Sequence, residues 1–365
     1  EILAEQHYLN FKKWFEPLGL TVSWLSGKQK GKARTAAEQS IQDGTANVVV
    51  GTHALFQDNV KFAKLGLVVI DEQHRFGVDQ RLALRNKGVN NTTPHQLVMT
   101  ATPIPRTLAM SAYGDLDTSV IDELPPGRTP IQTVTIPLDR REEVLQRVAK
   151  NCAEGKQAYW VCTLVEQSET LDAQAAEATY AEIKDRFPEL NIGLVHGRMK
   201  ADEKQSVMQQ FKDNEIQLLI ATTVIEVGVD VPNASIMVIE NAERLGLSQL
   251  HQLRGRVGRG ATASFCALLY KYPLSQNGQE RLRIMRETND GFIIAEKDLE
   301  IRGAGELLGT KQTGDMGFRV AKLERDDHLL NQAHHVAQQV LKDYPENAEA
   351  LLKRWLPDAP RYAYV

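Results

Sequence analysis

Two adjacent carboxylates, Asp71 and Glu72, follow an apolar run in the segment LGLVVIDEQHRFG, residues 65–77. An acid pair at the end of a buried strand suits hydrolysis of a nucleoside triphosphate. The first carboxylate helps to hold a Mg²⁺ ion that bridges phosphates, and the second positions or deprotonates the attacking water. A pair of solvated acids at a strand end gives the same pattern, so this interpretation needs support from other segments.

Two other segments supply this support. MTATPIPRT places Thr100 and Thr102 after another apolar run, and QLRGRVGRG holds Gln252, Arg256 and Arg259 in a Gln-x-x-Gly-Arg-x-Gly-Arg arrangement. Arginines presented to a γ-phosphate accelerate its transfer by roughly 10³–10⁵-fold. The glycines between them let the backbone approach a neighbouring surface closely.

A further segment, ATTVIEVGVDVP, lies between these two. Its Gly228 permits a close approach of the backbone, and Asp230 is suited to accept a hydrogen bond from a ribose hydroxyl. Taken together and in this order, the segments predict an NTPase site.

The composition is that of a globular protein, with 365 residues of which 42% are hydrophobic and 25% charged. At roughly 150 residues per domain, this length suggests two domains with an appendage. No apolar run approaches the ~20 residues needed to cross a bilayer, and no signal segment opens the chain. Cys152, Cys162 and Cys266 lack zinc-type spacing and are expected to be buried thiols in a reducing compartment, so we expect a cytoplasmic protein.

The net charge of −4 excludes binding of nucleic acid through bulk positive charge, so local clusters matter more. SGKQKGKAR, residues 26–34, has four bases and no acid, and LRGRVGRG, residues 253–260, has three arginines within six residues. Either cluster is suited to face phosphates. A solvated surface explains the first cluster equally well. It explains the second less well, because glycines between the arginines lower helix stability.

Short apolar runs alternate with amphipathic segments along most of the chain: VVVGT, LGLVVIDE, HQLVMTAT, AYWVCT, NIGLVHG, QLLIATT, SIMVIEN and FCALLY. This pattern predicts parallel strands with crossover helices, an α/β architecture. PPGRTP, residues 125–130, is typical of a domain boundary. After Tyr270, helical patterns replace the strands and are interrupted by a glycine-rich loop at residues 302–317.

Ligands of parallel sheets bind beyond the carboxyl ends of the strands. The polar residues that follow the apolar runs are therefore expected to share one edge of their sheet. These residues are Thr52, His53, Asp71, Glu72, Thr100, Thr102, Thr163, His196, Arg198, Thr222, Thr223 and Asp230.

The segments resemble superfamily two helicases, with DEQH at residues 71–74 as the second helicase motif. GTHALFQDNVKF, DEQHRFGVDQR, MTATPIPRTLAM, GLVHGRMK and ENAERLGLSQLHQLRGRVGRG narrow the resemblance to the RecG family of branched-DNA helicases, over essentially all of residues 1–365. The glycine-rich loop and the helices before it resemble the translocation motif that this family shares with the transcription-repair coupling factor.

The resemblance implies two RecA-like parallel-sheet helicase domains, the first incomplete, followed by a helical region with the translocation motif. We place a partial first domain at residues 1–128, a second domain at residues 129–272 and the helical region at residues 273–365. The implied activity is that of an ATP-dependent helicase and double-strand DNA translocase that uses ATP and Mg²⁺. It remodels stalled replication forks and Holliday junctions in recombination and repair. The family further implies a monomer whose partners are branched DNA and single-strand DNA-binding protein. No membrane is implied as a partner.

Four sets of residues are predicted to carry this activity. The catalytic set is Asp71, which also binds Mg²⁺, Glu72, Arg256 and Arg259. The nucleotide-binding set is Gln73, His74, Gly228, Asp230 and Gln252. The coupling set is Thr100, Thr102, Arg281, Arg302 and Gln312. The DNA-binding set is Thr52, His53, Thr163, His196, Arg198, Thr222 and Thr223. A structural hydrogen bond for His74 and strand-end capping for single threonines are the alternatives.

The phosphate-binding loop of the family, Gly-x-x-x-x-Gly-Lys-Ser/Thr, has no counterpart in this sequence. The chain opens at EILAEQH, which resembles the helix just after motif Ia. We therefore expect a C-terminal portion that lacks this loop, its strand and the N-terminal wedge domain. Such a portion is expected to turn over ATP weakly or not at all, and its first sheet is expected to lack an interior strand.

Two alternative functions stay open at this point. The translocation motif also fits the motor of a transcription-repair coupling factor. The residues of DEQHRFGVDQR, and the length of chain over which the resemblance holds, favour the RecG family. The other alternative is a non-catalytic DNA- or protein-binding module, for which salt-sensitive DNA binding without ATPase activity would be the signature.

Overall fold

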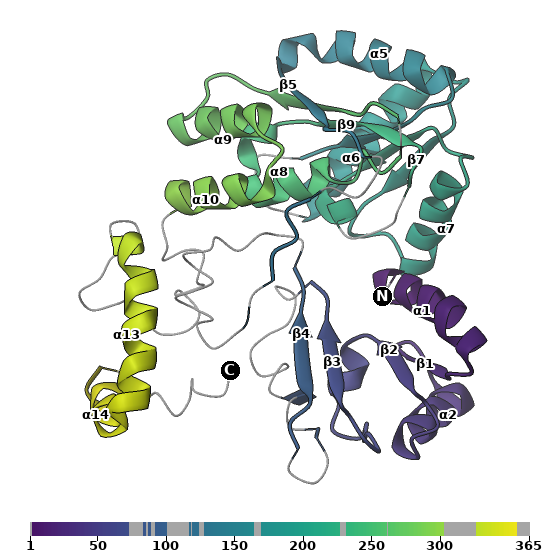
Figure 1. The fold of residues 1–365 in the computed structure, drawn as a ribbon. Coiled ribbons are helices and arrows are strands. Elements are labelled where there is room, and N and C mark those ends of the chain that lie inside the picture. Colours follow the sequence, from purple (N-terminus) through teal and green to yellow (C-terminus); the bar gives the residue numbers. More distant parts are fainter. Residues whose placement is uncertain are drawn as a thin grey trace. The chain divides into compact units, whose positions relative to one another are not determined.

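Parallel strands with crossover helices build the chain, which the computed structural model divides into two units (Figure 1). One unit comprises residues 1–101 and 335–365, and the other comprises residues 102–334. The structure describes residues 2–72, 83–84, 87–88, 92–100, 117, 119–123, 128–163, 169–226, 231–260, 262–302 and 326–355. The predicted α/β class is confirmed, and the domain boundaries expected after residues 128 and 272 stay predictions.

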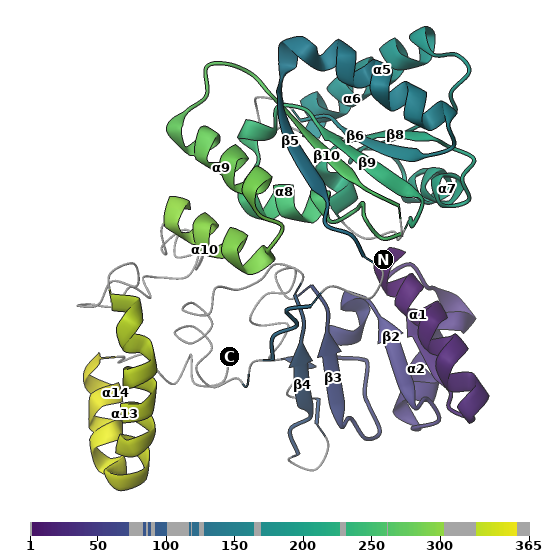
Figure 2. The same ribbon diagram turned by 45° about the horizontal axis from the view of Figure 1, so that its top comes forward.

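A six-stranded parallel sheet forms the centre of the second unit (Figure 2). Its strands are β5 (Gln132–Pro137), β6 (Gln157–Val161), β7 (Ile192–Val195), β8 (Leu218–Ala221), β9 (Ala234–Ile239) and β10 (Phe265–Tyr270). Their spatial order is β5-β10-β9-β6-β8-β7. Every residue of β6, β8 and β9 is buried, which is why these strands are mostly apolar rather than alternating between apolar and polar residues.

Helices cover both faces of this sheet. Their bounds are α5 (Arg141–Ala153), α6 (Glu169–Arg186), α7 (Ala201–Lys212), α8 (Leu247–Arg254), α9 (Gln276–Glu287) and α10 (Gly291–Arg302). Helices α5 and α6 pack on one face around Trp160, while α7, α8 and α9 pack on the other around Met237. Helix α10 packs against α8 and α9. Short 3₁₀ helices are η4 (Leu138–Arg140), η5 (Thr223–Glu226) and η6 (Ala242–Arg244).

The residue pattern of α5 explains its place on the sheet. Val144, Leu145, Val148, Ala149 and Cys152 are buried. Their spacing puts them on one stripe of the helix, and the charged residues between them face solvent. The stripe faces the sheet and closes the core cluster around Trp160.

The first unit contains two separate two-stranded parallel sheets in its described residues. β1 (Val22–Leu25) pairs with β2 (Val48–Gly51), and β3 (Leu67–Ile70) pairs with β4 (His95–Val98). Helices α1 (Ile2–Phe15) and α2 (Gly31–Gln42) pack on the first pair, and the 3₁₀ helices are η1 (Glu16–Leu18) and η2 (His53–Phe56). One face of β3–β4 is open, because Leu67, Val69 and Leu97 each expose about half of their surface.

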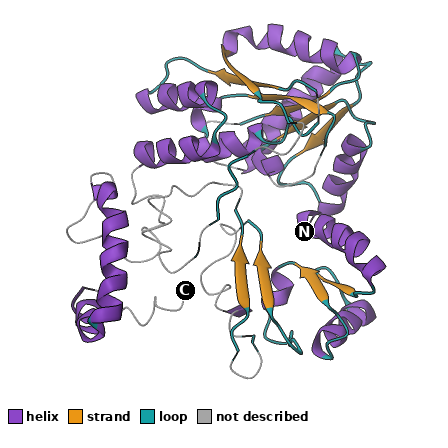
Figure 3. Ribbon diagram, viewed as in Figure 1, coloured by secondary structure: helices purple, strands orange, loops and turns teal. Residues whose placement is uncertain are grey.

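Helices also form the last described segment, as expected for the C-terminal region (Figure 3). They are η7 (Asp327–Leu329), α13 (Leu330–Asp343) and α14 (Pro345–Trp355). Among the helices that the structure describes, none combines the length and the apolar character required to cross a membrane.

Phe211 offers a test of the core of the second unit. It is fully buried, and its ring meets that of Tyr159 edge-on with 4.9 Å between the centroids. We expect Phe211→Ala to lower the free energy of unfolding of this unit by about 3–5 kcal/mol, because the cavity removes these contacts. Native-state hydrogen exchange of peptides from β6 and β8 measures the change. Val134→Ala, at a 44% exposed position, is the control and should stay within about 0.5 kcal/mol. Equal losses in both variants would contradict this packing.

Candidate functional site

Asp71 and Glu72 lie directly after β3. Two groups contact the Asp71 carboxylate: His7 Nε2 lies 3.1 Å from Oδ2, and the backbone nitrogen of Glu72 lies 2.9 Å from Oδ1. The hydrogen bond from His7 is the main cause of a lowered pKa of Asp71, and it outweighs the opposing effect of partial burial. The carboxylate is therefore ionised at neutral pH, as binding of a cation requires.

The backbone at Glu72 adopts a φ of 54°, in the left-handed region that residues other than glycine rarely adopt. Such conformations cost about 1–3 kcal/mol and are concentrated at functional sites. The predicted nucleotide contacts Gln73 and His74 follow immediately and lie outside the described residues.

Thr100 lies close to the acid pair. β4 pairs with β3 in a register that aligns Ile70 with Val98, and the Met99 backbone N–H donates to the Ile70 carbonyl oxygen with an N···O distance of 2.8 Å. The two strands therefore end side by side, and Thr100 follows Met99. Thr102, the other predicted coupling threonine of this segment, lies outside the described residues.

Thr52 and His53 lie at the end of the other strand pair of this unit. The Thr52 backbone N–H donates to the Leu25 carbonyl oxygen, with an N···O distance of 3.2 Å. The basic segment at residues 26–34 begins directly after Leu25 and exposes three lysines. The structure thus brings the first basic cluster and this predicted DNA contact to the same strand ends.

Five predicted DNA contacts follow strands of the second sheet: Thr163, His196, Arg198, Thr222 and Thr223. Because β6, β8 and β7 are neighbours and parallel, their carboxyl ends gather these residues at one edge. Thr163, His196 and Thr222 are buried, with exposed fractions of 5%, 7% and 5%. Thr223 is half-buried and Arg198 is exposed.

Protein groups already use part of this edge. The Thr163 hydroxyl donates to the Glu240 carbonyl oxygen over 2.5 Å, and His196 Nε2 lies 3.3 Å from a carboxylate oxygen of Glu177. The Thr163 side chain therefore stabilises the strand end itself, in line with the capping alternative. Arg198 and Thr223 are the more accessible members of the set.

The segment with the predicted catalytic arginines follows α8. Gln252 lies in the last turn of this helix and is half-buried. Arg256 is buried, with an exposed fraction of 9%, whereas Arg259 is half-buried and donates from Nε to the Gly255 carbonyl oxygen over 3.3 Å. Only part of each guanidinium-bearing side chain is thus presented to solvent.

Two glycines allow this segment to run close to its neighbours. Gly258 has a φ of +76°, and a Cβ atom placed on Gly260 would lie 2.6 Å from the Pro232 carbonyl oxygen. The close backbone approach inferred from the glycine spacing is therefore present at Gly260. Gly228, Asp230 and Gln312 lie outside the described residues, as does the side chain of Arg302 at the end of α10.

The structure corrects the prediction for Arg254, which the sequence groups with arginines that face phosphates. Its side chain is 2% exposed, and its guanidinium donates to the carbonyl oxygens of Met285 and Thr288 over 2.8 and 2.9 Å. The same group lies 3.2 Å from His251 Nδ1. Arg254 therefore anchors α8 to the end of α9. Since these carbonyls lie 31 and 34 residues away, no local pattern reveals this role.

Two more contacts tie α9 and α10 to the elements around α8. The Arg281 guanidinium donates to the Glu243 carbonyl oxygen over 2.9 Å, and Ser248 Oγ lies 3.2 Å from Asp298 Oδ2. Asp298 is 2% exposed, which is unusual for a carboxylate. Sequence reasoning assigned a role to Arg281 but missed Asp298, because its partner lies 50 residues earlier.

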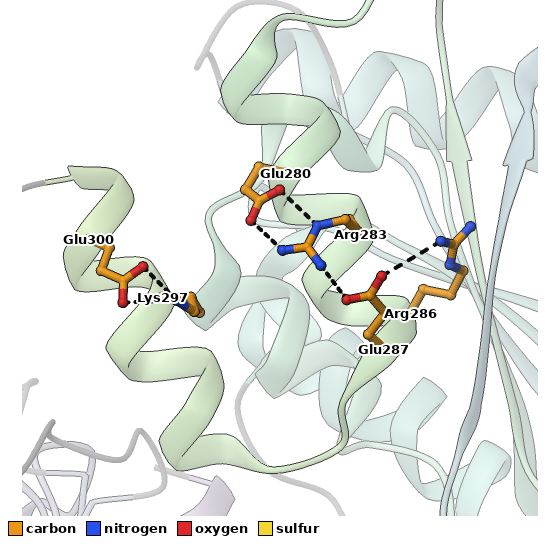
Figure 4. A network of polar contacts seen from close by, with 6 residues as sticks. All are labelled: Glu280, Arg283, Arg286, Glu287, Lys297 and Glu300. Atoms are coloured by element: carbon orange, nitrogen blue, oxygen red, sulfur yellow. Dashed lines mark hydrogen bonds and ion pairs between the residues drawn. The ribbon is translucent and has the colours of Figure 1, made fainter.

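Exposed ion pairs lie on α9 and α10 (Figure 4). Arg283 pairs with Glu280 and Glu287, and Lys297 pairs with Glu300. Exposed pairs of this kind contribute about 0.2–1 kcal/mol each. These ion pairs lie within single helices, whereas the buried contacts of Arg254 and Asp298 join α8 to α9 and α10.

A metal centre built from several side chains is not found within the described part of the chain, where no group of three or more His, Cys, Asp or Glu residues is suitably arranged.

Three family models match the chain. A DEAD/DEAH box helicase model matches residues 1–111, and a helicase conserved C-terminal domain model matches residues 140–261. A third model, for the C-terminal part of domain 3 of the ATP-dependent DNA helicase RecG, matches residues 288–354.

The relatives narrow the family further. The ATP-dependent DNA helicase RecG of Escherichia coli strain K12 is 64% identical over 365 residues, and that of Bacillus subtilis is 48% identical over 99% of the chain. The chain belongs to the RecG family. It spans about half of the length of these relatives, 53% and 54% respectively.

Solved structures agree with this assignment to the RecG family. The structure of RecG bound to a three-way DNA junction has a TM-score of 0.70 and 44% identity, over 90% of this chain and 42% of that chain. Saccharomyces cerevisiae Dbp5 bound to RNA and ADP BeF3 has a TM-score of 0.56 at 15% identity, over 82% of this chain and 78% of that chain. The second likeness concerns the fold alone.

Arg254→Met is expected to lower the free energy of unfolding of the second unit by about 3 kcal/mol, because two buried carbonyl oxygens lose their charged donor. Urea unfolding followed by hydrogen exchange of α9 peptides measures the loss. Arg283→Met, which removes an exposed arginine and its ion pairs, is the control and should cost less than about 1 kcal/mol. If Arg254→Met is no more costly than this control, the anchoring role is wrong.

Burial, reinforced by the positive charge of Arg254, lowers the pKa of His251 from 6.5 to about 4. Folded His251 stays neutral at a pH where the unfolded chain already binds a proton. The stability of the second unit should therefore be complete above about pH 6.5 and fall by up to about 3 kcal/mol as the pH drops towards 4. Unfolding measured from pH 7 to 4.5 tests this, and His251→Gln should flatten the slope. An unchanged slope in that variant would exclude His251 as its source.

Proposed function

We propose that the chain is the motor portion of an ATP-dependent DNA helicase that translocates on double-stranded DNA and remodels stalled forks and Holliday junctions in recombination and repair. The observation that carries the proposal is the 64% identity to RecG of Escherichia coli over all 365 residues. The structure of RecG bound to a three-way DNA junction supports branched DNA as the class of substrate. We retain two helicase domains, at residues 1–128 and 129–272, with a helical region after them.

Asp71 is the residue that we assign to Mg²⁺. The fit is supported because Mg²⁺ prefers ionised carboxylate oxygens, and the Asp71 carboxylate keeps lone pairs beyond those that contact His7 and Glu72. A Mg²⁺ ion held by Asp71 would supply positive charge that stabilises the negative charge developing on the phosphates. Glu72 positions the attacking water and accepts its proton.

Arg256 and Arg259 are assigned to the γ-phosphate, where their charge stabilises the transition state. The close approach of Gly260 to Pro232 supports this assignment, because it packs the segment that carries these arginines against its neighbour. The further nucleotide contacts that we assign are Gln73, His74, Gly228, Asp230 and Gln252.

The DNA contacts are assigned to strand ends in both units, with Arg198 and Thr223 as the most accessible in the second. Hydroxyl, guanidinium and backbone N–H groups there hold phosphates without reading bases. The other members of this set are Thr52, His53, Thr163, His196 and Thr222. Coupling of hydrolysis to movement is assigned to Thr100, Thr102, Arg281, Arg302 and Gln312.

When a fork is remodelled, the two nascent duplexes are unpaired while the parental and daughter duplexes form. Each step costs and returns about 1.4 kcal/mol of stacking, so the exchange is nearly balanced. The motor therefore supplies direction and force against obstacles. From the RecG resemblance we extend the proposal to a cytoplasmic monomer that contacts single-strand DNA-binding protein.

The proposal is tested by ATP hydrolysis with and without a model fork. Two proteins are compared: this chain, and a chimera in which the N-terminal half of the Escherichia coli relative precedes it. We expect fork-stimulated hydrolysis by the chimera and little by the chain. In the chimera, Glu72→Gln and Arg259→Ala should each lower kcat by about 10³-fold or more.

Arg147→Ala is the control for these variants, because Arg147 is an exposed arginine on α5 with no assigned role. It should leave the rate unchanged. A chimera that ignores the fork would overturn the proposed function. Equal fork-stimulated rates of chain and chimera would instead show that residues of this chain hold the phosphates.

A further inference from the structure

His7 reaches the Asp71 carboxylate from the first helix of the chain, 64 residues earlier in the sequence. We propose that His7 is a positioning residue, which holds the Asp71 carboxylate in the orientation that binds Mg²⁺ with ATP. This inference rests on the proposed function, because it needs Asp71 to be the Mg²⁺ ligand. It assigns His7 no contact with the nucleotide.

The hydrogen bonds of Asp71 leave room for a metal ion. A carboxylate has about four lone-pair sites on its two oxygens. One site on Oδ2 faces His7 Nε2 at 3.1 Å, and one on Oδ1 faces the Glu72 backbone nitrogen at 2.9 Å. Each oxygen therefore keeps a site for Mg²⁺ or its bound water. Since a carboxylate only accepts, His7 presents the tautomer with a proton on Nε2.

The two donors hold the carboxylate from different parts of the fold. The Glu72 N–H belongs to the strained backbone after β3, whereas His7 belongs to α1. Together the two donors restrict rotation of the Asp71 side chain more than either donor does alone. Hydrogen bonds to a metal ligand from outside the metal site commonly raise metal affinity in this way.

The imidazole itself is held by aromatic neighbours. The His7 ring stacks on Phe11 with 6.3 Å between centroids, and Phe11 in turn stacks on Phe15 at 5.7 Å. Tyr8 packs against Trp24 of β1 at 5.5 Å, which ties this part of α1 to the first strand pair. The side chains of His7 and Asp71 are 38% and 35% exposed, so a ligand can reach them.

Two other roles of the contact make different predictions. If His7 only ties α1 to β3, its loss lowers stability and leaves the Mg²⁺ requirement unchanged. If His7 instead competes with Mg²⁺ for Oδ2, its loss lowers the Mg²⁺ requirement. A positioning residue is distinguished from both, because its loss raises the Mg²⁺ requirement.

The experiment makes two measurements on the chimera. The first is ATP hydrolysis as a function of Mg²⁺ concentration at saturating ATP and fork DNA. The second is the binding of Mn²⁺ in place of Mg²⁺ with a non-hydrolysable ATP analogue, followed by electron paramagnetic resonance, which His7→Leu should weaken by about 10–100-fold. We expect His7→Leu to raise the Mg²⁺ concentration for half-maximal rate by about 10–100-fold. The rate at saturating Mg²⁺ should return to near that of the unsubstituted chimera. His7→Gln places an amide N–H near the position of Nε2 and should restore most of the affinity. Lys13→Ala, on the exposed side of the same helix, should change nothing.

Three results would overturn the positioning role of His7. An unchanged Mg²⁺ requirement in His7→Leu, with or without a lower melting temperature, overturns the positioning role. A lowered requirement identifies His7 as a competitor and also overturns it. If the unsubstituted chimera fails to hydrolyse ATP, the proposed function fails first and the inference falls with it. An active chimera that is insensitive to His7→Leu overturns the inference alone.

Discussion

Parallel pairing of strands is the constraint on which the rest of this protein depends. Parallel neighbours end at the same edge, and crossover helices close both faces of the sheet, so polar groups can gather only beyond the strand ends. That edge must also satisfy its own polar atoms. Glu240, at the end of β9, accepts hydrogen bonds from Trp160 Nε1 over 2.9 Å and from Arg141 Nε over 2.5 Å. The side chains that stabilise the strand ends and those predicted to bind ligands therefore lie at the same edge of the sheet.

Sequence patterns predicted the α/β class, the parallel strands and the positions of strand-end residues such as Asp71 and Thr222. These features depend on local periodicity and on residues that follow directly in the chain. Longer-range partners were not predictable. Arg254 lies in the same arginine- and glycine-rich segment as Arg256, yet its guanidinium anchors α8 to α9. The partner of Asp71 comes from α1, and no spacing rule connects the two.

Arginine illustrates how surroundings decide the use of one chemical group. Arg283 has carboxylate partners in its own helix and is exposed, so water screens its ion pairs. Arg254 has only neutral oxygen partners in its described contacts with α9, but it is buried, where each lost hydrogen bond leaves a carbonyl unsatisfied. The number of charged partners is thus a poor guide to structural importance. Burial and the sequence distance of the partners are better guides.

The open face of β3–β4 has a practical consequence. Leu67, Val69 and Leu97 form an apolar row on a short sheet whose outer strand edges are unpaired among the described strands. Such faces and edges are templates for aggregation between copies. The second unit has its sheet covered on both faces. When the chain is concentrated, precipitation should therefore begin at the first unit, and salts that strengthen apolar association should bring it on sooner.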